Sequence, residues 1–247
     1  MARESRVTLR RTAVEVKNTR QFIKILRTLL GALAILLVVV YIVTILYHNY
    51  GAFTVSVQKF DSIDYSVVLS DDPDFLNPTP RLNCNASKEV TNIAGSSIPA
   101  DVNNRYGEHN GENYVAYTFA CKNNGKKACD YFYEVYITNI TKQLDKAVRV
   151  MLFVNDDKEV FARTASDGSG AEPGTKEFQT GNTIVKKQIT NFKPGEVTKF
   201  TVVIWIEGND PDCVDDKLGG EFKIDMSITV ANAEKNSSDK KSSEKAA

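Results

Sequence analysis

The sequence predicts a mainly β protein, in which one N-terminal transmembrane helix precedes an antiparallel β-sandwich ectodomain. One observation behind this is a single uncharged apolar run of twenty residues near the N-terminus. The other is a series of short runs rich in Val, Ile, Thr, Tyr and Phe, separated by turn residues. The 247 residues, 42% hydrophobic and 25% charged, suffice for one sizeable folded domain. A disordered, collagen-like or multi-spanning chain is excluded.

The apolar run covers residues 28–47. As a helix it would extend roughly 30 Å, which is the hydrocarbon thickness of a bilayer. A helix also satisfies its own backbone hydrogen bonds inside lipid. A cleaved signal peptide is the competing interpretation, but such peptides have a shorter apolar core and a clearer small-residue cleavage site than Gly51-Ala52. We therefore expect an uncleaved signal-anchor helix with the lipid bilayer as its partner.

Charge is distributed unevenly about this run. Residues 1–27 carry eight basic and two acidic side chains, a net charge of +6, and the rest of the chain carries −6. The positive-inside rule then places residues 1–27 in the cytoplasm and residues 48–232 outside the cell, as a single-pass cell-membrane protein. Nothing in the basic segment resembles a folded nucleic-acid reader, so we expect no nucleic-acid partner. Residues 233–247 are polar and charged, which predicts a disordered tail.

The body of the chain is predicted to consist of strands, because β-branched and aromatic residues favour a pleated surface. Residues 131–138 alternate between apolar and polar faces, whereas residues 202–206 are apolar on both faces and predict a central strand with Trp205 in the core. Residues 70–112 form a long polar segment, which we expect to be a contact surface. The predicted strands are Phe53–Phe60, Tyr65–Leu69, Tyr114–Cys121, Tyr131–Thr138, Ala147–Val154, Glu159–Arg163, Thr183–Ile189, Thr198–Glu207 and Glu221–Val230.

The four cysteines suggest disulfides in an extracellular domain. Cys121 and Cys129 bracket an Asn-Asn-Gly turn, so a bridge between two adjacent strands is one expectation, which would pair Cys84 with Cys213. Four cysteines allow three pairings, and unpaired thiols remain an alternative. The spacing contains no C-x-x-C pair of the kind that structural zinc sites use.

One stretch after the predicted central strand is strongly acidic. Crowded carboxylates are suitable ligands for calcium, a hard cation that prefers oxygen. The spacing is not that of an EF-hand, so a solvated loop is the alternative interpretation. The candidate calcium ligands are Glu207, Asp210, Asp212, Asp215 and Asp216. No other cofactor is expected.

Sequence patterns of catalysis are missing. The two histidines, His48 and His109, do not form an H-E-x-x-H pair, and neither a G-x-S-x-G elbow nor a P-loop occurs. We therefore predict no catalytic residues and no enzymatic activity. An enzyme of unrecognised type stays an alternative if His109 lies with acids and a serine in a cleft.

Residues 113–230 resemble the TasA/camelysin family of Gram-positive surface and biofilm-matrix proteins. The resemblance rests on the Cys-Lys-Asn-Asn-Gly turn at 121–125 and on Asn191–Glu196, which leads into residues 201–208, and on the last strand, 220–230. It implies a jelly-roll-like sandwich, held at the surface or secreted, that assembles by strand exchange. The expected function is therefore a structural, adhesive or matrix-assembly role at the cell envelope, through a protein partner or self-assembly. A ligand-binding or sensing ectodomain, dependent on calcium, is the alternative.

Overall fold

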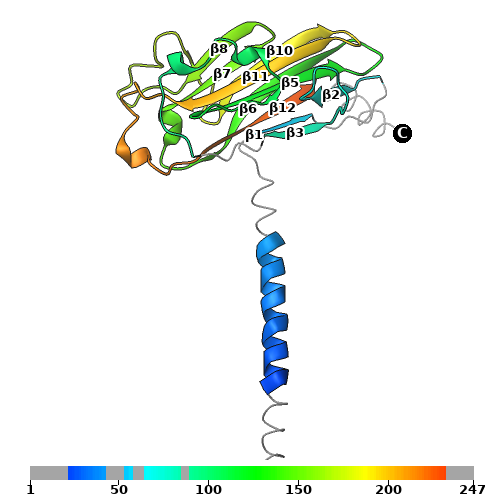
Figure 1. Cartoon of the computed structure of the whole chain (residues 1–247). Coiled ribbons are helices and arrows are strands. Elements are labelled where there is room, and N and C mark those ends of the chain that lie inside the picture. Colours follow the sequence, from blue (N-terminus) through cyan, green and yellow to red (C-terminus); the bar gives the residue numbers. More distant parts are fainter. Residues whose placement is uncertain (1–21, 43–52, 58–63, 85–88, 232–247) are drawn as a thin grey trace, which may run out of the picture. The chain divides into compact units, whose positions relative to one another are not determined.

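The computed structural model describes residues 22–42, 53–57, 64–84 and 89–231, and the chain divides into two compact units, residues 1–50 and 51–247 (Figure 1). The first unit contains the helix Phe22–Ile42, whose 21 residues have a mean hydropathy of 2.5, and its length and composition fit a membrane crossing. It begins six residues before the predicted span, and residues 43–47 lie outside the described ranges. The predicted basic segment up to residue 21 and the predicted tail at 233–247 also lie outside them.

The second unit is built of strands, most of which match the predicted ranges to within a few residues. Three short strands, β3, β4 and β9, were not predicted. The strands are β1 (Phe53–Val57), β2 (Val67–Ser70), β3 (Arg81–Cys84), β4 (Gly107–Glu108), β5 (Tyr114–Asn123), β6 (Cys129–Ile140), β7 (Val148–Val154), β8 (Asp157–Ala162), β9 (Lys176–Glu177), β10 (Thr183–Phe192), β11 (Val197–Ile206) and β12 (Phe222–Val230).

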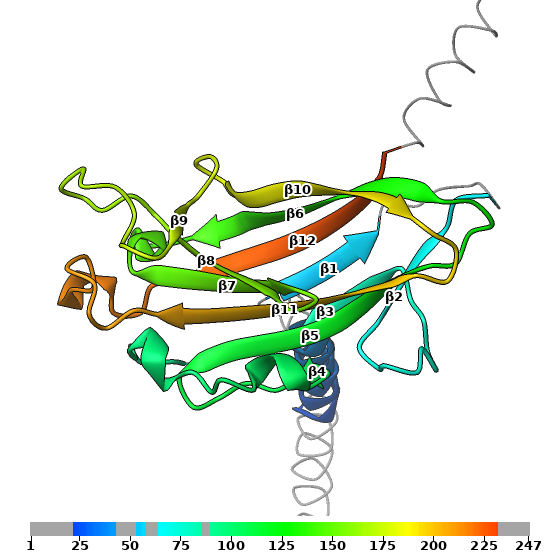
Figure 2. The ribbon, with the colours of Figure 1, turned by 90° about the horizontal axis from the view of Figure 1, so that it is seen from above.

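Within the described residues these strands form two sheets, which Figure 2 shows as two layers. Sheet A has the order β10-β6-β12-β1-β3, and sheet B has the order β2-β5-β11-β7-β8-β9, with β4 also paired to β5. The expectation of purely antiparallel pairing is wrong, because β1 runs parallel to β12 and β9 runs parallel to β8. Both sheets are therefore mixed, although most pairs in them are antiparallel.

The main core lies between the two sheets. The alternation predicted for β6 is confirmed, since Tyr131, Tyr133 and Val135 are buried while their neighbours in the strand are half-buried. Aromatic rings join the layers: Tyr133 of β6 meets Phe200 of β11 edge-on, with ring centroids 5.3 Å apart. Edge-to-face contact suits the ring quadrupole and adds to the apolar burial.

Strand β11 is buried on both faces, as predicted from its sequence. Its residues Phe200 and Val202 belong to the main core, whereas Val203 and Trp205 belong to a second apolar cluster on the outer face of sheet B. Residues 89–112 cover that outer face and contribute Ile98 and Val102 to the second cluster. Figure 2 shows this segment, which includes β4, running alongside β5 on the outside of the sandwich.

A chain of buried hydroxyls and an amide also fixes residues 89–112 to sheet B. The Thr118 hydroxyl lies 2.7 Å from the Thr201 hydroxyl, which donates to Asn103 Oδ1 at 2.7 Å. Asn103 Nδ2 in turn donates to the carbonyl oxygen of Asn155 at 2.9 Å. Because Thr201 has one hydroxyl proton and gives it to Asn103, Thr118 must be the donor to Thr201. Residues 89–112 of the predicted contact segment 70–112 thus cover the outer face of sheet B.

Strand β10 lies at one edge of sheet A, and part of its outward backbone is hydrogen-bonded by a side chain. The side-chain amide of Gln179 accepts from Lys186 N at 2.9 Å and donates to Lys186 O at 3.3 Å, as a neighbouring strand would. Lys187 of the same strand pairs with Glu159 of β8, which also pairs with Lys176, and this joins the edges of the two sheets. Burial alone would raise the pKa of Glu159, but these two ion pairs hold it below its usual value.

We predict that Ile98→Ala destabilises the protein by about 2–3 kcal/mol, because it opens a cavity in the second apolar cluster. Ile98 is 9% exposed and the control residue Leu76 is 74% exposed, so Leu76→Ala should change stability little. Urea unfolding of the full chain in detergent micelles can be followed by the fluorescence of Trp205, the single tryptophan, which lies in the same cluster. A loss for Ile98→Ala no larger than for the control would contradict the described packing of residues 89–112.

Candidate functional site

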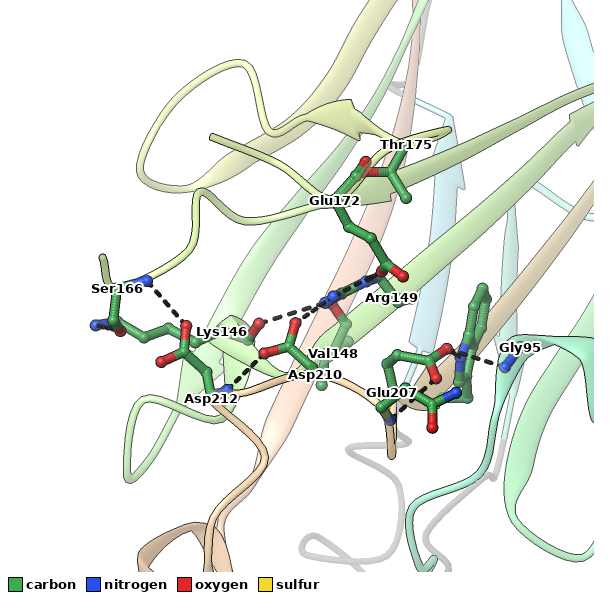
Figure 3. Close-up of polar contacts among 12 residues, drawn as sticks. Gly95, Lys146, Val148, Arg149, Ser166, Glu172, Thr175, Glu207, Asp210 and Asp212 are labelled. Atoms are coloured by element: carbon green, nitrogen blue, oxygen red, sulfur yellow. Dashed lines mark hydrogen bonds and ion pairs between the residues drawn. The ribbon is translucent and has the colours of Figure 1, made fainter. Parts of the chain in front are cut away.

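The predicted calcium ligands lie at the end of β11 and in the loop that follows, and Figure 3 shows Glu207, Asp210 and Asp212 among them. Glu207 is 6% exposed, yet its carboxylate is well satisfied by donors of the protein itself. Its Oε2 accepts from the Trp205 indole N–H at 3.0 Å and from the Gly95 backbone N–H at 2.9 Å. Asn209 N donates to Oε1 at 3.3 Å. Glu207 therefore joins β11 to the covering segment, and charge-assisted hydrogen bonds of this kind are stabilising.

The backbone of Gly95 packs closely against this contact. A Cβ at position 95 would lie 3.0 Å from a ring carbon of Trp205 and 3.2 Å from Glu207 Oε2. A larger residue at position 95 would therefore require the indole ring or the carboxylate to move by a few tenths of an ångström.

Asp210 is engaged with a buried arginine. Arg149 of β7 points to the outer face of sheet B, and its side chain is only 3% exposed. Its guanidinium pairs with Asp210 and donates through Nε to Glu172 Oε2 at 3.0 Å. Nη1 also lies within hydrogen-bond distance of the Lys146 and Val148 carbonyl oxygens. A buried cation is tolerated only when it is paired in this way, so the arrangement holds two loops against the sheet.

The remaining acidic residues are not gathered around a common point. Asp212 accepts from Ser166 N at 2.9 Å, and hydrogen bonding to Ser166, first by its side chain and then by this backbone N–H, holds the pKa of the Asp212 carboxyl below its usual value. Asp215 and Asp216 lie in a short exposed 3-10 turn, where Asp216 is 3.5 Å from Lys217. Within the described ranges, no three His, Cys, Asp or Glu side chains come close enough together to hold a metal ion. Within this stretch, Glu207, Asp210 and Asp212 hold loops in place through protein partners.

All four cysteines lie in the described ranges, and none of them forms a disulfide. Cys121 of β5 lies opposite Thr198 and Cys129 of β6 lies opposite Phe192, so the two expected partners belong to opposite sheets, and a bridge between them would join the sheets rather than adjacent strands. Both thiols are buried, and burial together with the neighbouring Cys129 raises the pKa of Cys121. Cys84 is buried in β3, whereas Cys213 is partly exposed on the acidic loop and near Asn92.

His109 packs against the backbone of its own segment. Its Nδ1 lies 2.9 Å from Gly107 O and its Nε2 lies 3.0 Å from Val102 O. Both ring nitrogens are therefore directed at main-chain carbonyls. The arrangement positions β4 beside the preceding turn.

Arg149 is the central residue of the polar cluster, and the sequence analysis did not single it out. The signal available was one cationic residue within an otherwise apolar strand, Val148–Val154. Such a residue must find a counter-charge from a neighbouring loop when its strand is covered on both faces. Pattern alone could not say that Asp210 and Glu172 would supply it.

A second polar cluster lies on the outer face of sheet A. Tyr136 of β6 is opposite Asp225 of β12, which is opposite Thr54 of β1. Thr54 N donates to Asp225 Oδ1 at 3.0 Å. Burial raises the pKa of Asp225, despite that hydrogen bond and the nearby cations Lys223 and Arg81. Burial and the charges of Asp225 and Glu134 also raise the pKa of Tyr136, against the influence of Arg81.

No protein-family model matches the chain. No curated protein matches it either. Among solved structures, a β-glucosidase from Kluyveromyces marxianus in complex with glucose is similar at 16% identity and a TM-score of 0.26, over 67% of this chain and 16% of that enzyme. The selenomethionine-labelled form of this enzyme is similar at 14% identity and a TM-score of 0.25, over 65% of this chain and 17% of the enzyme. Scores this low assign neither a fold nor an activity to the chain.

Asp210→Ala should destabilise the protein by about 3 kcal/mol, because it leaves the buried Arg149 guanidinium without its less exposed counter-charge. Glu172→Ala is the matched control: its side chain is 45% exposed, against 9% for Asp210, so its loss should cost under about 1 kcal/mol. Urea unfolding of the full chain in detergent would measure both. Equal losses for the two variants would contradict a buried Arg149–Asp210 pair.

Asp225→Asn should raise the melting temperature at pH 7. A carboxyl whose pKa is raised by folding adds most stability below its unfolded pKa and loses it as pH rises through the folded pKa. The asparagine keeps an oxygen for Thr54 N and removes the buried charge, so the advantage should disappear near pH 3, below the ordinary Asp pKa of about 3.9. Melting curves at both pH values would test this, with exposed Asp157→Asn as control. A lower melting temperature than wild type at pH 7 would show that the charge is stabilising.

Proposed function

We propose that the protein is a single-pass membrane protein whose N-terminus is cytoplasmic and whose β domain stands outside the cell in a structural, adhesive or matrix-assembly role. The observation that carries this is the apolar helix Phe22–Ile42 ahead of a β body. The net charge of +6 in residues 1–27 supports the orientation through the positive-inside rule.

The proposed mode of action is contact through a face or loop of the domain. Exposed sheet edges pair readily with other strands, and natural proteins protect them. Here the side-chain amide of Gln179 hydrogen-bonds both backbone groups of Lys186 at the outer edge of β10. The outer edge of β5 is paired with β2 along one part of its length and with β4 along another. In an antiparallel pair, every second residue directs its backbone N–H and C=O away from the partner strand. Gln188 lies two residues after Lys186, so its backbone groups form a short stretch of the β10 edge that is open to another strand. Side-chain surfaces are thus more available for contact than strand edges.

The resemblance to TasA/camelysin proteins supports a matrix role and a jelly-roll-like arrangement of the sandwich as parts of this proposal. Strand exchange between copies would have to use the open stretch of β10 or displace a strand already paired. Calcium is not part of the proposal, because Glu207, Asp210 and Asp212 already have protein donors as partners.

Cysteine labelling on intact cells that express the full chain tests the topology. Because Cys84, Cys121 and Cys129 are buried and Cys213 is partly exposed, a membrane-impermeant maleimide should label Cys213 alone. Cys213→Ser should abolish the labelling, and Ser5→Cys in that background should react only after the membrane is permeabilised. Labelling at position 5 in intact cells, or recovery of the chain from the aqueous fraction without detergent, would refute the proposed topology.

A further inference from the structure

We propose that the outer face of sheet A binds a neutral glycan chain, with Tyr136, Asp225, Arg81 and Asn83 as its central contacts. This inference rests on the proposed function, since it gives the extracellular domain a ligand class. It starts from a difference between the two sheets. The outer face of sheet B is apolar and is covered by residues 89–112, whereas no described segment covers the outer face of sheet A in this way.

The strand register places the outward side chains of sheet A in rows. Two rows cross all five described strands. The first row consists of Thr183, Tyr136, Asp225, Thr54 and Asn83. The second row consists of Lys186, Glu134, Ser227, Ser56 and Arg81. A third, shorter row consists of Gln188, Phe132 and Thr229. These rows are rich in hydroxyl and amide groups, although Thr54 among them is only 7% exposed, and two aromatic rings lie within the rows.

The charges within these rows balance. The rows contain two acidic and two basic side chains, and one of each, Lys186 and Glu134, form an ion pair at 3.0 Å. Glu134 also accepts from the Thr183 hydroxyl at 3.0 Å. A face without net charge does not attract polyanions such as nucleic acid or an anionic lipid surface. This leaves neutral ligands as the class that the electrostatics favour.

The hydrogen-bonding groups that β12 and β3 contribute to the rows match sugar hydroxyls, which both donate and accept. Arg81 and Asn83 are exposed, and the Arg81 Nε–H donates to Asn83 Oδ1 only at a long 3.4 Å. Asp225 uses Oδ1 for Thr54 N, and its carboxylate retains further acceptor capacity. The donors and the amide on β3 thus lie on the same face as the acceptor on β12, with β1 between the two strands.

Tyr136 supplies the stacking surface. It is half-buried beside Asp225, with its ring on the outer face. The negative face of an aromatic ring attracts polarised C–H groups, which sugar rings present on their flat sides. The other outward ring, Phe132, has the Lys186 ammonium 5.9 Å above it. Tyr136 is therefore the ring that we expect to anchor a sugar.

A protein partner fits this face less well. The centre of a protein interface is normally apolar and depleted of charge. The outward rows of sheet A contain no Leu, Ile, Val or Met, and the apolar residues of these strands point to the core. Hydroxyl-rich rows around one ring are better matched to a carbohydrate.

The experiment uses the full chain in detergent micelles and calorimetric titration with neutral hexasaccharides of glucose, mannose, galactose, xylose and N-acetylglucosamine. Hexagalacturonate is the anionic comparison. We expect saturable binding to at least one neutral hexasaccharide. Tyr136→Ala and Arg81→Ala should each weaken it about tenfold or more, equivalent to about 1.4 kcal/mol. Tyr106→Ala and Lys158→Ala, a matched ring and a matched cation away from this face, should leave the affinity unchanged.

Each alternative outcome would overturn the inference. These are the absence of binding to all five neutral sugars, binding to hexagalacturonate alone, and binding that Tyr136→Ala and Arg81→Ala leave intact. Circular dichroism of the two variants identifies any that fail to fold, and Arg81→Gln then replaces Arg81→Ala. Cysteine labelling reads out topology without any sugar, so a failure here is distinguishable from a failure of the proposed topology.

Discussion

The burial of β11 on both of its faces is the constraint on which the rest of the β domain depends. A strand with apolar side chains on one face needs one partner layer, whereas β11 needs two. Sheet A supplies the first layer, through contacts such as Tyr133 against Phe200. Residues 89–112 supply the second, by placing Ile98 and Val102 over Val203 and Trp205. The long polar segment is ordered because the apolar surface beneath it must be removed from water.

The cover over the outer face of sheet B also buries polar and charged side chains, and the acidic loop supplies partners for them. Arg149 lies on that face among apolar neighbours, and a buried guanidinium without a partner would be costly. Asp210 and Glu172 provide the counter-charge. Glu207, at the end of β11, is balanced in turn by the Trp205 indole and by Gly95 N. Carboxylates that suggested a metal site in the sequence thus stabilise loops in the fold.

The two outer faces of the sandwich are consequently unlike. Sheet B is closed by its own chain, whereas the outward rows of sheet A are polar, balanced in charge and centred on Tyr136 and Asp225. Antiparallel pairs commonly leave one sheet face in water, so openness alone carries no function. The combination of a half-buried ring, an exposed arginine and amide, and a carboxyl with a raised pKa distinguishes this face.

Local features were determined by the sequence alone. Alternation in β6 and two-sided apolarity in β11 record how many faces of each strand are buried, and the apolar run near the N-terminus records a helix fit for a membrane. These signals are readable because burial follows the period of the backbone. Partners between distant segments leave no such local record. Only the tertiary structure decided that β1 lies parallel to β12, that Cys121 and Cys129 fall in opposite sheets, and that Asp210 pairs with Arg149. Short strands such as β3 and β4 exist because a neighbouring strand is present to bind them, so their own residues could not predict them.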